Sequence, residues 1–153
     1  MQKEKFRSFE IAAAEIVFLV HATEDKDRVL NLVSTILIVD INEFESANLL
    51  GHWGNHIDII KARLEGKPAR DVTMTILTSL DTSDRKKLLY SLGNYTDEKG
   101  NLHLRLDKQK ICEGKIELSD IDSIKIKFKP KLFFSRIKQD YIREYRRLLD
   151  SNE

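Results

Sequence analysis

The fold is decided by the stretch FEIAAAEIVFLVH, residues 9–21, which is apolar at nearly every position. Ile16, Phe18 and Val20 would share one face of a strand, and the residues between them are apolar as well. Such a run predicts a long strand with both faces covered by other parts of the protein. The three alanines at 12–14 weaken this prediction, because alanine favours helix.

The next segment is the clearest helix in the sequence. Its apolar residues recur at the spacing i, i+3, i+4, i+7 and i+8, which makes one stripe along a helix. They are Val29, Leu32, Val33, Ile36 and Leu37. Thr23 or Asp25 can cap the N-terminus, where acidic side chains also suit the positive end of the helix dipole.

The middle of the chain predicts one strand and three helices. Residues 42–50 have the moderate alternation of a second strand. The expected helices are residues 55–65, capped by Asn55 and ended by Gly66, residues 68–80, started by Pro68, and residues 83–92, capped by Asp81 or Ser83.

Strands dominate the last third, at residues 102–106, 115–118 and 124–128, and a final amphipathic helix follows Pro130. Its expected stripe is Phe134, Ile137, Tyr141, Tyr145 and Leu148. This order predicts an α+β fold of two layers, with helices packed on one face of a mostly antiparallel sheet. We expect a main domain at 1–130, and a basic helix at 131–153 packed on that domain or on a dimer partner.

Composition describes one folded domain of 153 residues with 41% hydrophobic and 33% charged residues. The single cysteine, Cys112, excludes an intramolecular disulfide and any multi-cysteine metal site. No signal peptide is recognised, so a reducing cytoplasm is the expected location. The longest apolar run, residues 16–20, is far too short to span a bilayer, and no membrane partner is expected.

The net charge of +1 conceals a strong asymmetry along the chain. Residues 8–60 hold nine acids against two bases, and residues 125–147 hold nine bases against two acids. Such a split indicates either an anionic partner for the basic end or head-to-tail charge matching between subunits.

Lys125, Lys127 and Lys129 are the clearest basic feature. Alternation places the three ammonium groups on one face of a strand, about 7 Å apart, which is comparable to the spacing of phosphates in a nucleic acid. Lys131, Arg105 on a nearby strand and the basic last helix favour a nucleic-acid interpretation. The alternative is a solvated sheet edge on which lysines prevent pairing with other strands.

The segment Asp107-Lys108-Gln109-Lys110 follows Arg105 at the end of a predicted strand. Lys108 and Lys110 can contact phosphate there, and the amide between them can contact ribose. A polar turn without a ligand is the alternative.

The loop Gly51-His52-Trp53-Gly54-Asn55-His56 holds the only tryptophan of the chain. His52 and His56 are four residues apart, as in some zinc sites, but Gly54 and Asn55 interrupt any helix between them, so we expect no metal. Either Trp53 packs on the core of the protein, or Trp53 and His52 contact a ligand or RNA by stacking.

No catalytic motif is recognised. The sequence has no phosphate-binding glycine loop, dinucleotide fingerprint, nucleophile elbow or paired cysteines. We therefore expect no catalytic residue and no cofactor. A metal-dependent hydrolase using His21, His52, His56 and the acids near Glu24 is kept as the least favoured class.

Three segments, taken in order, resemble a family of archaeal RNA-binding or exosome-subunit-like proteins. They are Phe18-Leu19-Val20-His21-Ala22-Thr23-Glu24-Asp25, Gly51-His52-Trp53-Gly54-Asn55-His56-Ile57, and Leu104-Arg105-Leu106-Asp107-Lys108-Gln109 with Gly114 following. The resemblance covers residues 8–129. The family loop usually has histidine or tyrosine where Trp53 stands, and proline where His56 stands.

That resemblance implies a two-layer domain, similar in fold to the large-subunit ribosomal protein that holds the 5S RNA. It also implies a homodimer and a role related to RNA. We therefore expect a non-catalytic RNA-binding protein, an accessory factor in RNA processing or ribosome-related work. A dimeric protein-interaction module without RNA binding is the alternative.

Overall fold

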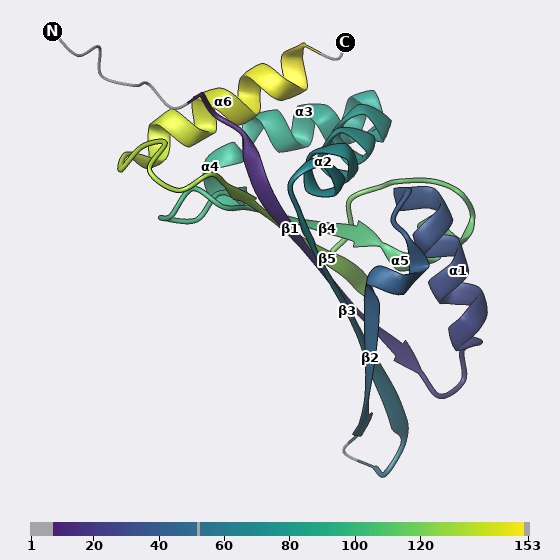
Figure 1. Ribbon diagram of the computed structural model, residues 1–153. Helices are drawn as coiled ribbons and strands as arrows, with labels where there is room; N and C mark the ends of the chain where they lie inside the picture. The colour runs from purple at the N-terminus through teal and green to yellow at the C-terminus, as the bar shows by residue number, and fades with distance from the viewer. Residues whose placement is uncertain (1–7, 52, 152–153) are drawn as a thin grey trace, which may run out of the picture.

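The computed structural model describes residues 8–51 and 53–151 (Figure 1). The elements, in chain order, are β1 (Ile11–His21), α1 (Lys26–Leu37), a 3-10 turn η1 (Ile41–Glu43), β2 (Phe44–Leu50), β3 (His56–Glu65), α2 (Lys67–Ser79), α3 (Thr82–Tyr90), α4 (Leu92–Tyr95), β4 (Leu102–Asp107), α5 (Lys108–Cys112), β5 (Ser123–Pro130) and α6 (Lys138–Asp150). No helix in the described ranges is both long and apolar enough to cross a membrane.

The five strands form one antiparallel sheet in the order β2-β3-β1-β5-β4. The apolar first strand, β1, is central and pairs with β3 on one side and with β5 on the other. The helices gather on one side of the twisted sheet (Figure 1). The predicted fold class, a two-layer α+β domain with an antiparallel sheet, is therefore confirmed.

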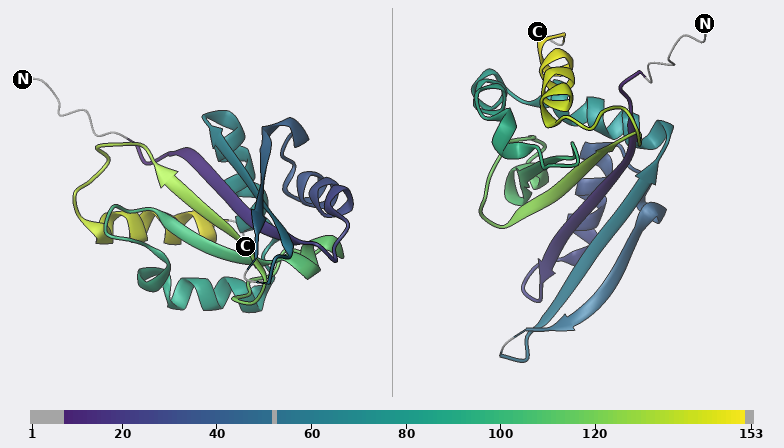
Figure 2. Two further views of the ribbon diagram at one scale, coloured as in Figure 1. Left: turned by 90° about the horizontal axis from the view of Figure 1, so that it is seen from below. Right: turned by 90° about the vertical axis from the view of Figure 1, so that its left-hand side faces the viewer.

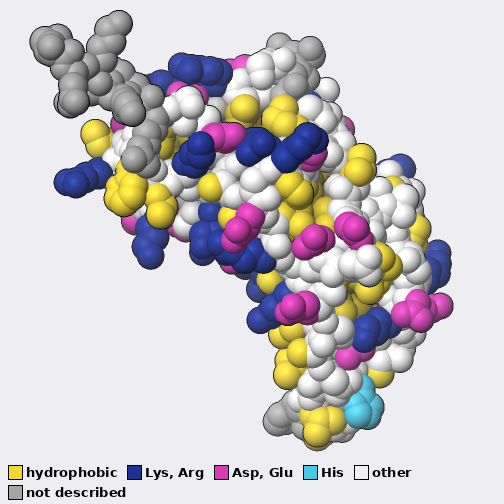
Figure 3. Space-filling view, in the orientation of Figure 1, with side chains coloured by type: hydrophobic (Ala, Val, Ile, Leu, Met, Phe, Trp, Pro, Cys, Tyr) yellow, Lys and Arg dark blue, Asp and Glu magenta, His cyan; other side chains and the backbone are white. Residues whose placement is uncertain are grey.

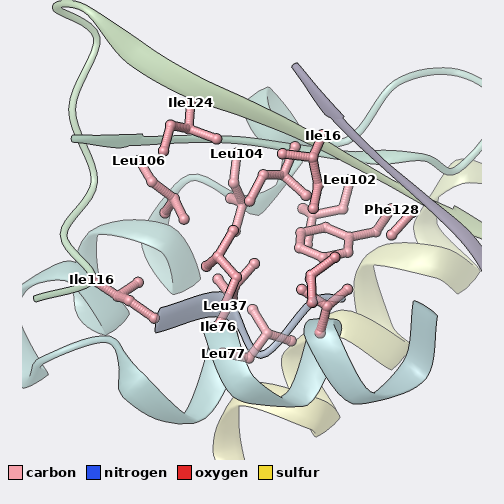
Figure 4. Close-up of a cluster of buried hydrophobic side chains, with 14 of the residues drawn as sticks. Ile16, Leu37, Ile76, Leu77, Leu102, Leu104, Leu106, Ile116, Ile124 and Phe128 are labelled. Atoms are coloured by element: carbon pink, nitrogen blue, oxygen red, sulfur yellow. The ribbon is translucent and has the colours of Figure 1, made fainter. Parts of the chain in front are cut away.

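The core lies between the sheet and the helices and is drawn in Figure 4. Ile16 of β1 and Phe128 of β5 point into it from the sheet, and Leu37 of α1 and Ile76 of α2 point into it from the helices. All four side chains are almost completely buried, so they are removed from water, which is the main favourable term in folding.

One sequence prediction about the middle of the chain was wrong. Residues 55–65 are not a helix, because β3 takes their place and pairs with both β1 and β2. The buried residues Ile60, Ala62 and Leu64 alternate with exposed ones, and this period of two fits a strand better than a helix. Sheet pairing on two sides overrides the cap signal of Asn55.

The segment after β4 also differs from prediction. Lys108–Cys112 forms the short helix α5, with the Asp107 carboxylate accepting a hydrogen bond from the Lys110 N–H at its N-terminus. The predicted strand at 115–118 is reduced to one bridge between Leu106 and Leu118. The polar turn offered as the alternative for residues 107–110 is instead this helix, which Asp107 caps.

The last helix begins at Lys138, later than the sequence pattern indicated. Tyr141 and Tyr145 are buried as predicted, but Ile137 precedes the helix and is exposed. The Tyr145 hydroxyl donates a hydrogen bond of 2.5 Å to the Gly100 carbonyl. Because Gly100 has φ 86° and lies directly under the Tyr141 ring, glycine is required at this contact between α6 and the turn before β4.

We predict that Gly100→Ala lowers the free energy of unfolding by about 2–4 kcal/mol, because a methyl group would combine left-handed strain with overlap with the Tyr141 ring. Gly54→Ala is the matched control, since Gly54 also has positive φ but has open space around it, and should cost about 1 kcal/mol. Urea denaturation measures both. Equal losses would show that contact with Tyr141 does not constrain position 100.

Candidate nucleic-acid interface

The face of the sheet opposite the helices, called here the open face, carries the side chains that alternate with the core residues. Its members are Glu45, Ala47 and Leu49 of β2, Ile57, Ile59, Lys61 and Arg63 of β3, Glu15, Val17, Leu19 and His21 of β1, Lys125, Lys127 and Lys129 of β5, and His103 and Arg105 of β4. The prediction that both faces of the first strand are covered was wrong, because Leu19 and His21 are exposed on this face.

Basic side chains form two rows across the open face. In one row the strand register places Arg105 of β4, Lys125 of β5, Val17 of β1 and Lys61 of β3 side by side, in that order. In the next row it places His103 beside Lys127, with Glu15 and Arg63 following. Directly opposed residues are about 5 Å apart, and the rows are separated by about 7 Å. We call these two rows the cation rows.

Most of these cations have no carboxylate of their own. Arg63 pairs with Glu15 at 3.0 Å and with Glu65 at 3.1 Å. By contrast, Lys61, Arg105, Lys125, Lys127 and Lys129 are in no ion pair with the part of the chain that the structure describes. The cation rows therefore present positive charge to solvent.

The three strand lysines lie on one face, as the alternation predicted, but not at an edge. β5 is an interior strand between β1 and β4, and Lys125 has Val17 on one side and Arg105 on the other. An interior strand already has both its backbone edges paired, so the interpretation that these lysines prevent edge pairing does not apply.

Asp97 orients the histidine of the cation rows. Its carboxylate accepts hydrogen bonds from the backbone N–H groups of Lys99 and Asn101, and lies 2.8 Å from His103 Nε2. Burial opposes ionisation of Asp97, but the hydrogen bonds from His103, Asn101 and Lys99 outweigh it and lower its pKa to about 2. The ring of His103 is thereby held beside Lys127.

Lys108 does not belong to the interface, which corrects its prediction as a phosphate contact. Its side chain is 2% exposed, and its ammonium donates to the Leu19 carbonyl at 2.7 Å and to Glu24 at 2.8 Å. The ammonium also lies 3.2 Å from Asp122. A phosphate could reach it only by breaking these contacts.

The Lys108 ammonium lies where β1 and β5 separate. β1 and β5 are paired only as far as Val17 and Lys125, and beyond that point the Leu19 carbonyl bonds to the ammonium instead. Burial opposes ionisation of Glu24, but hydrogen bonds from the His21 N–H and from Lys108 hold the pKa of Glu24 below its usual value. One buried cation thus joins the end of β1, the turn into α1 and the start of β5.

The same contacts weigh against a metal centre. His21, Glu24 and Asp122 are close enough together to hold an ion, but the ammonium of Lys108 already binds both carboxylates. His56 is not in this group, and its ring is instead 3.2 Å from the Asn48 side-chain oxygen on the neighbouring strand. Of the residues suggested for a hydrolase, His21 and Glu24 thus lie together and His56 lies elsewhere, whereas His52 is outside the described residues.

The other two predicted lysines already have acidic partners. The Lys131 ammonium lies 2.8 Å from Glu10, whose pKa is lowered chiefly by the hydrogen bond from that lysine. Lys110 is on α5, away from the open face, and is 3.5 Å from Glu113. The acidic and basic halves of the chain meet partly within one molecule, so the charge asymmetry does not by itself require a second subunit.

The glycine loop is the tip of the β2–β3 hairpin, which extends beyond the other strands (Figures 1 and 2). Gly51 donates to the Asn55 carbonyl and Gly54 donates to the Gly51 carbonyl, which closes a tight turn. Trp53 is 83% exposed, so the alternative in which it packs on the core was wrong. His52, the second predicted stacking ring, lies outside the described residues.

Lys61, Arg63 and His103 were missed by the sequence predictions. The first two fell in residues predicted as helix, where their shared face could not be recognised. The alternation of Ile60, Ala62 and Leu64 with charged residues was the available signal.

Comparison with known proteins identifies the family of this chain. Residues 13–130 match the model of a protein family described as RNA binding. The chain belongs to this RNA-binding family. The match includes β2, β3, β4 and β5 in full, and β1 from Ala13 onward.

Two relatives and one solved structure are similar over most of their length. The chain is 30% identical over 133 residues to the uncharacterized protein MJ0213 of Methanocaldococcus jannaschii, covering 82% of this chain and 89% of that protein. It is 32% identical over 120 residues to the RNA-binding protein PAB1135 of Pyrococcus abyssi, covering 74% and 78%. Mth689, a DUF54 protein from Methanothermobacter thermautotrophicus, has a TM-score of 0.74 at 26% identity, covering 91% and 98%.

We predict that Lys108→Met lowers the free energy of unfolding by roughly 2–3 kcal/mol at neutral pH, because two carboxylates lose their cation. The loss is smaller than for a fully buried ion pair, because Glu24 and Asp122 are partly exposed to water. Lys110→Met, which changes an exposed lysine on the same helix, should change stability by less than about 0.5 kcal/mol.

The loss should also depend on pH. The lowered pKa of Glu24 contributes stability above its ordinary value of 4.5, and this contribution is lost as the pH falls below that value. The difference between wild type and Lys108→Met, measured by urea denaturation, should therefore shrink below pH 4.5. A difference that is constant with pH would contradict a role for the charged contact.

Proposed function

We propose that this protein binds RNA on the open face, with the cation rows contacting phosphates and without catalysing a reaction. The observation that carries this proposal is the group of Lys61, Arg105, Lys125 and Lys127, four cations without acidic partners in the described chain, on a sheet face that no helix covers. Membership of an RNA-binding family supports the choice of RNA as the anion.

The geometry of the rows suits a phosphodiester backbone. Arg105 lies about 5 Å from Lys125, and Lys125 lies about 7 Å from Lys127, so successive phosphates can each meet a lysine or an arginine there. Lys61 lies two strands from Lys125, about 10 Å away. Lys129 extends the positive surface along β5 by one further position. A hollow of about 650 Å³, lined in part by Val17, Lys61 and Arg63, adjoins the rows on the β2 side and gives room for a base or sugar.

Acidic side chains lie at the border of the basic surface. Glu43 and Glu45 line the far wall of the same hollow and would repel phosphate, so we expect the backbone to follow β5 and β4 rather than β2. Figure 3 shows basic side chains gathered over the upper part of the molecule, with hydrophobic side chains and a histidine near the lower end. A contact at that end would therefore rely on rings rather than on charge.

Trp53 is the proposed ring at the far end of the hairpin. It is exposed at the tip of the same sheet, where an unpaired base could stack on its indole. The arginines of α6 are left out of the proposal, because α6 packs against α2, α3 and α4 on the helical side. Arg143 and Arg147 also pair with acids on their own helix.

We further propose a cellular role for the protein in RNA metabolism. An accessory factor in RNA processing or in ribosome-related work fits a face that binds a phosphate backbone. The resemblance of residues 18–25, 51–57 and 104–109 to exosome-subunit-like proteins supports this choice. The RNA bound in cells is identified by sequencing what the protein retains.

We predict that replacing Lys125 and Lys127 with alanine weakens RNA binding and flattens its salt dependence. Each lost phosphate contact reduces the slope of log K against log salt by about 0.7 on a single strand, so the slope should fall by about 1.4. Fluorescence anisotropy with an oligouridylate and with a hairpin RNA gives the slope.

The matched control replaces Lys86 and Lys87 on α3, two exposed lysines of the helical layer. It removes the same charge from the other side of the molecule and should leave the slope nearly unchanged. If the salt slope fell by the same amount in both double variants, RNA binding would depend on the net charge of the protein rather than on the open face.

We predict that Trp53→Ala lowers RNA affinity about tenfold without changing the salt slope, because base stacking contributes about 1–3 kcal/mol and involves no phosphate. Tyr90→Ala is the control, since Tyr90 is another highly exposed ring, on α3. An unchanged affinity for Trp53→Ala would remove the hairpin tip from the interface.

A further inference from the structure

The two edges of the sheet differ in how they are protected. At the β4 edge, the Asp107 N–H donates to the Glu117 carbonyl and the Arg105 carbonyl accepts from the Ser119 N–H. Leu102 also forms a bridge with Thr96. At the β2 edge, no comparable backbone partner for Ser46, Asn48 or Leu50 occurs in the described ranges. One edge of the sheet is covered and the other is open.

The hydrogen-bond pattern shows which β2 groups face outward. Gly51 donates to Asn55, so Gly51 and Asn55 form a hydrogen-bonded pair, and antiparallel alternation makes Leu49 and Ala47 bond to β3 as well. The N–H and C=O groups of Ser46, Asn48 and Leu50 must then point away from the sheet. They form a row of six backbone groups along the edge that have no partner among residues 8–51 and 53–151.

β2 lacks the usual devices that keep an edge from pairing. Its seven residues include no proline, lysine or arginine, and Glu45 is its one charged side chain. The strand is regular in its pairing with β3, without a bulge. Leu49 and Leu50 are exposed near its end, and Leu50 is 71% exposed. Natural proteins rarely leave such an edge bare.

We propose that β2 pairs antiparallel with β2 of a second copy of this chain, about a two-fold axis at Asn48. In this register Ser46 lies opposite Leu50 of the other copy, and Ala47 lies opposite Leu49. The cross-strand contacts on the open face are then apolar on both sides of the axis, and Glu45 lies beyond them, opposite Gly51. A register centred on Ala47 would instead place Glu45 directly opposite Leu49 of the other copy, so that a carboxylate would contact an apolar side chain.

The pairing extends the open face rather than hiding it. A two-fold axis perpendicular to the sheet leaves both open faces on the same side of one ten-stranded sheet. The half-buried Ile57 and Ile59 of each copy then flank the seam, and the cation rows of the two copies lie on either side of it. This consequence rests on the proposed function, whereas the pairing itself does not involve RNA.

The first test measures mass without RNA. Sedimentation equilibrium of nuclease-treated protein should give twice the chain mass of 17.8 kDa for wild type. Leu50→Lys and Ser46→Pro should both give the single-chain mass with an unchanged circular dichroism spectrum, because neither residue bonds to β3 through its backbone. Ile121→Lys, at a position that is 82% exposed but lies in the turn before β5, should stay dimeric.

The second test fixes the register. In a Cys112→Ser background, Asn48→Cys should cross-link to its own copy under mild oxidation, because the axis brings the two Cα atoms to about 5.5 Å. Ser46→Cys should not cross-link, since its copy would lie about 13 Å away.

A wild-type monomer at every concentration, or a dimer that survives both edge variants, would overturn the proposal. If the wild type is a monomer and Leu50→Lys abolishes its RNA binding, the pairing proposal is overturned as well, and the edge is assigned to RNA. Loss of the dimer in an edge variant that still binds RNA with the full salt slope would support the pairing and leave the proposed function intact.

Discussion

The structure depends on one buried ammonium group. Lys108 reaches from the end of β4 into a gap between β1 and β5, where it binds a backbone carbonyl of β1, Glu24 in the turn to α1, and Asp122 before β5. A buried cation without such partners would destabilise the fold by several kcal/mol. Two of the three segments that resemble the family, residues 18–25 and 104–109, meet at this contact.

The gap closed by Lys108 sets the shape of the functional surface. Because β1 and β5 are paired only as far as Val17 and Lys125, the paired part of the sheet carries the cations and the separated part carries Leu19 and His21. The open face thus has a basic region next to an apolar one. The helices take the other face, where they bury the core and leave the cation rows free to meet a ligand.

The sequence was sufficient for the parts of the fold that local pattern controls. The apolar run at 9–21, the stripe from Val29 to Leu37 and the alternation at 124–128 predicted a strand, a helix and a strand that the structure contains. Residues 55–65 were predicted incorrectly, because pairing with β1 and β2 on both sides decides that segment and neither neighbour is visible in a local window.

The site was predictable where it lies on strands recognised in the sequence. Lys125, Lys127 and Lys129 could be placed on one face from period two alone, and Arg105 was expected on a nearby strand, whereas Lys61 joins them only through the register of β3. Lys108 was predicted for the site but lies outside it. A lysine at a strand end suggested a phosphate contact, but its burial is set by Glu24, which lies 84 residues away in sequence.

The most direct test of the central claim is lysine footprinting of the full chain with and without RNA. Acetylation followed by mass spectrometry measures the reactivity of each ammonium group separately. We expect RNA to protect Lys61, Lys125 and Lys127, to leave Lys86 and Lys87 reactive, and to leave Lys108 unreactive in both states because it is buried. Protection of the helical lysines with continued reactivity of the strand lysines would contradict an RNA interface on the open face.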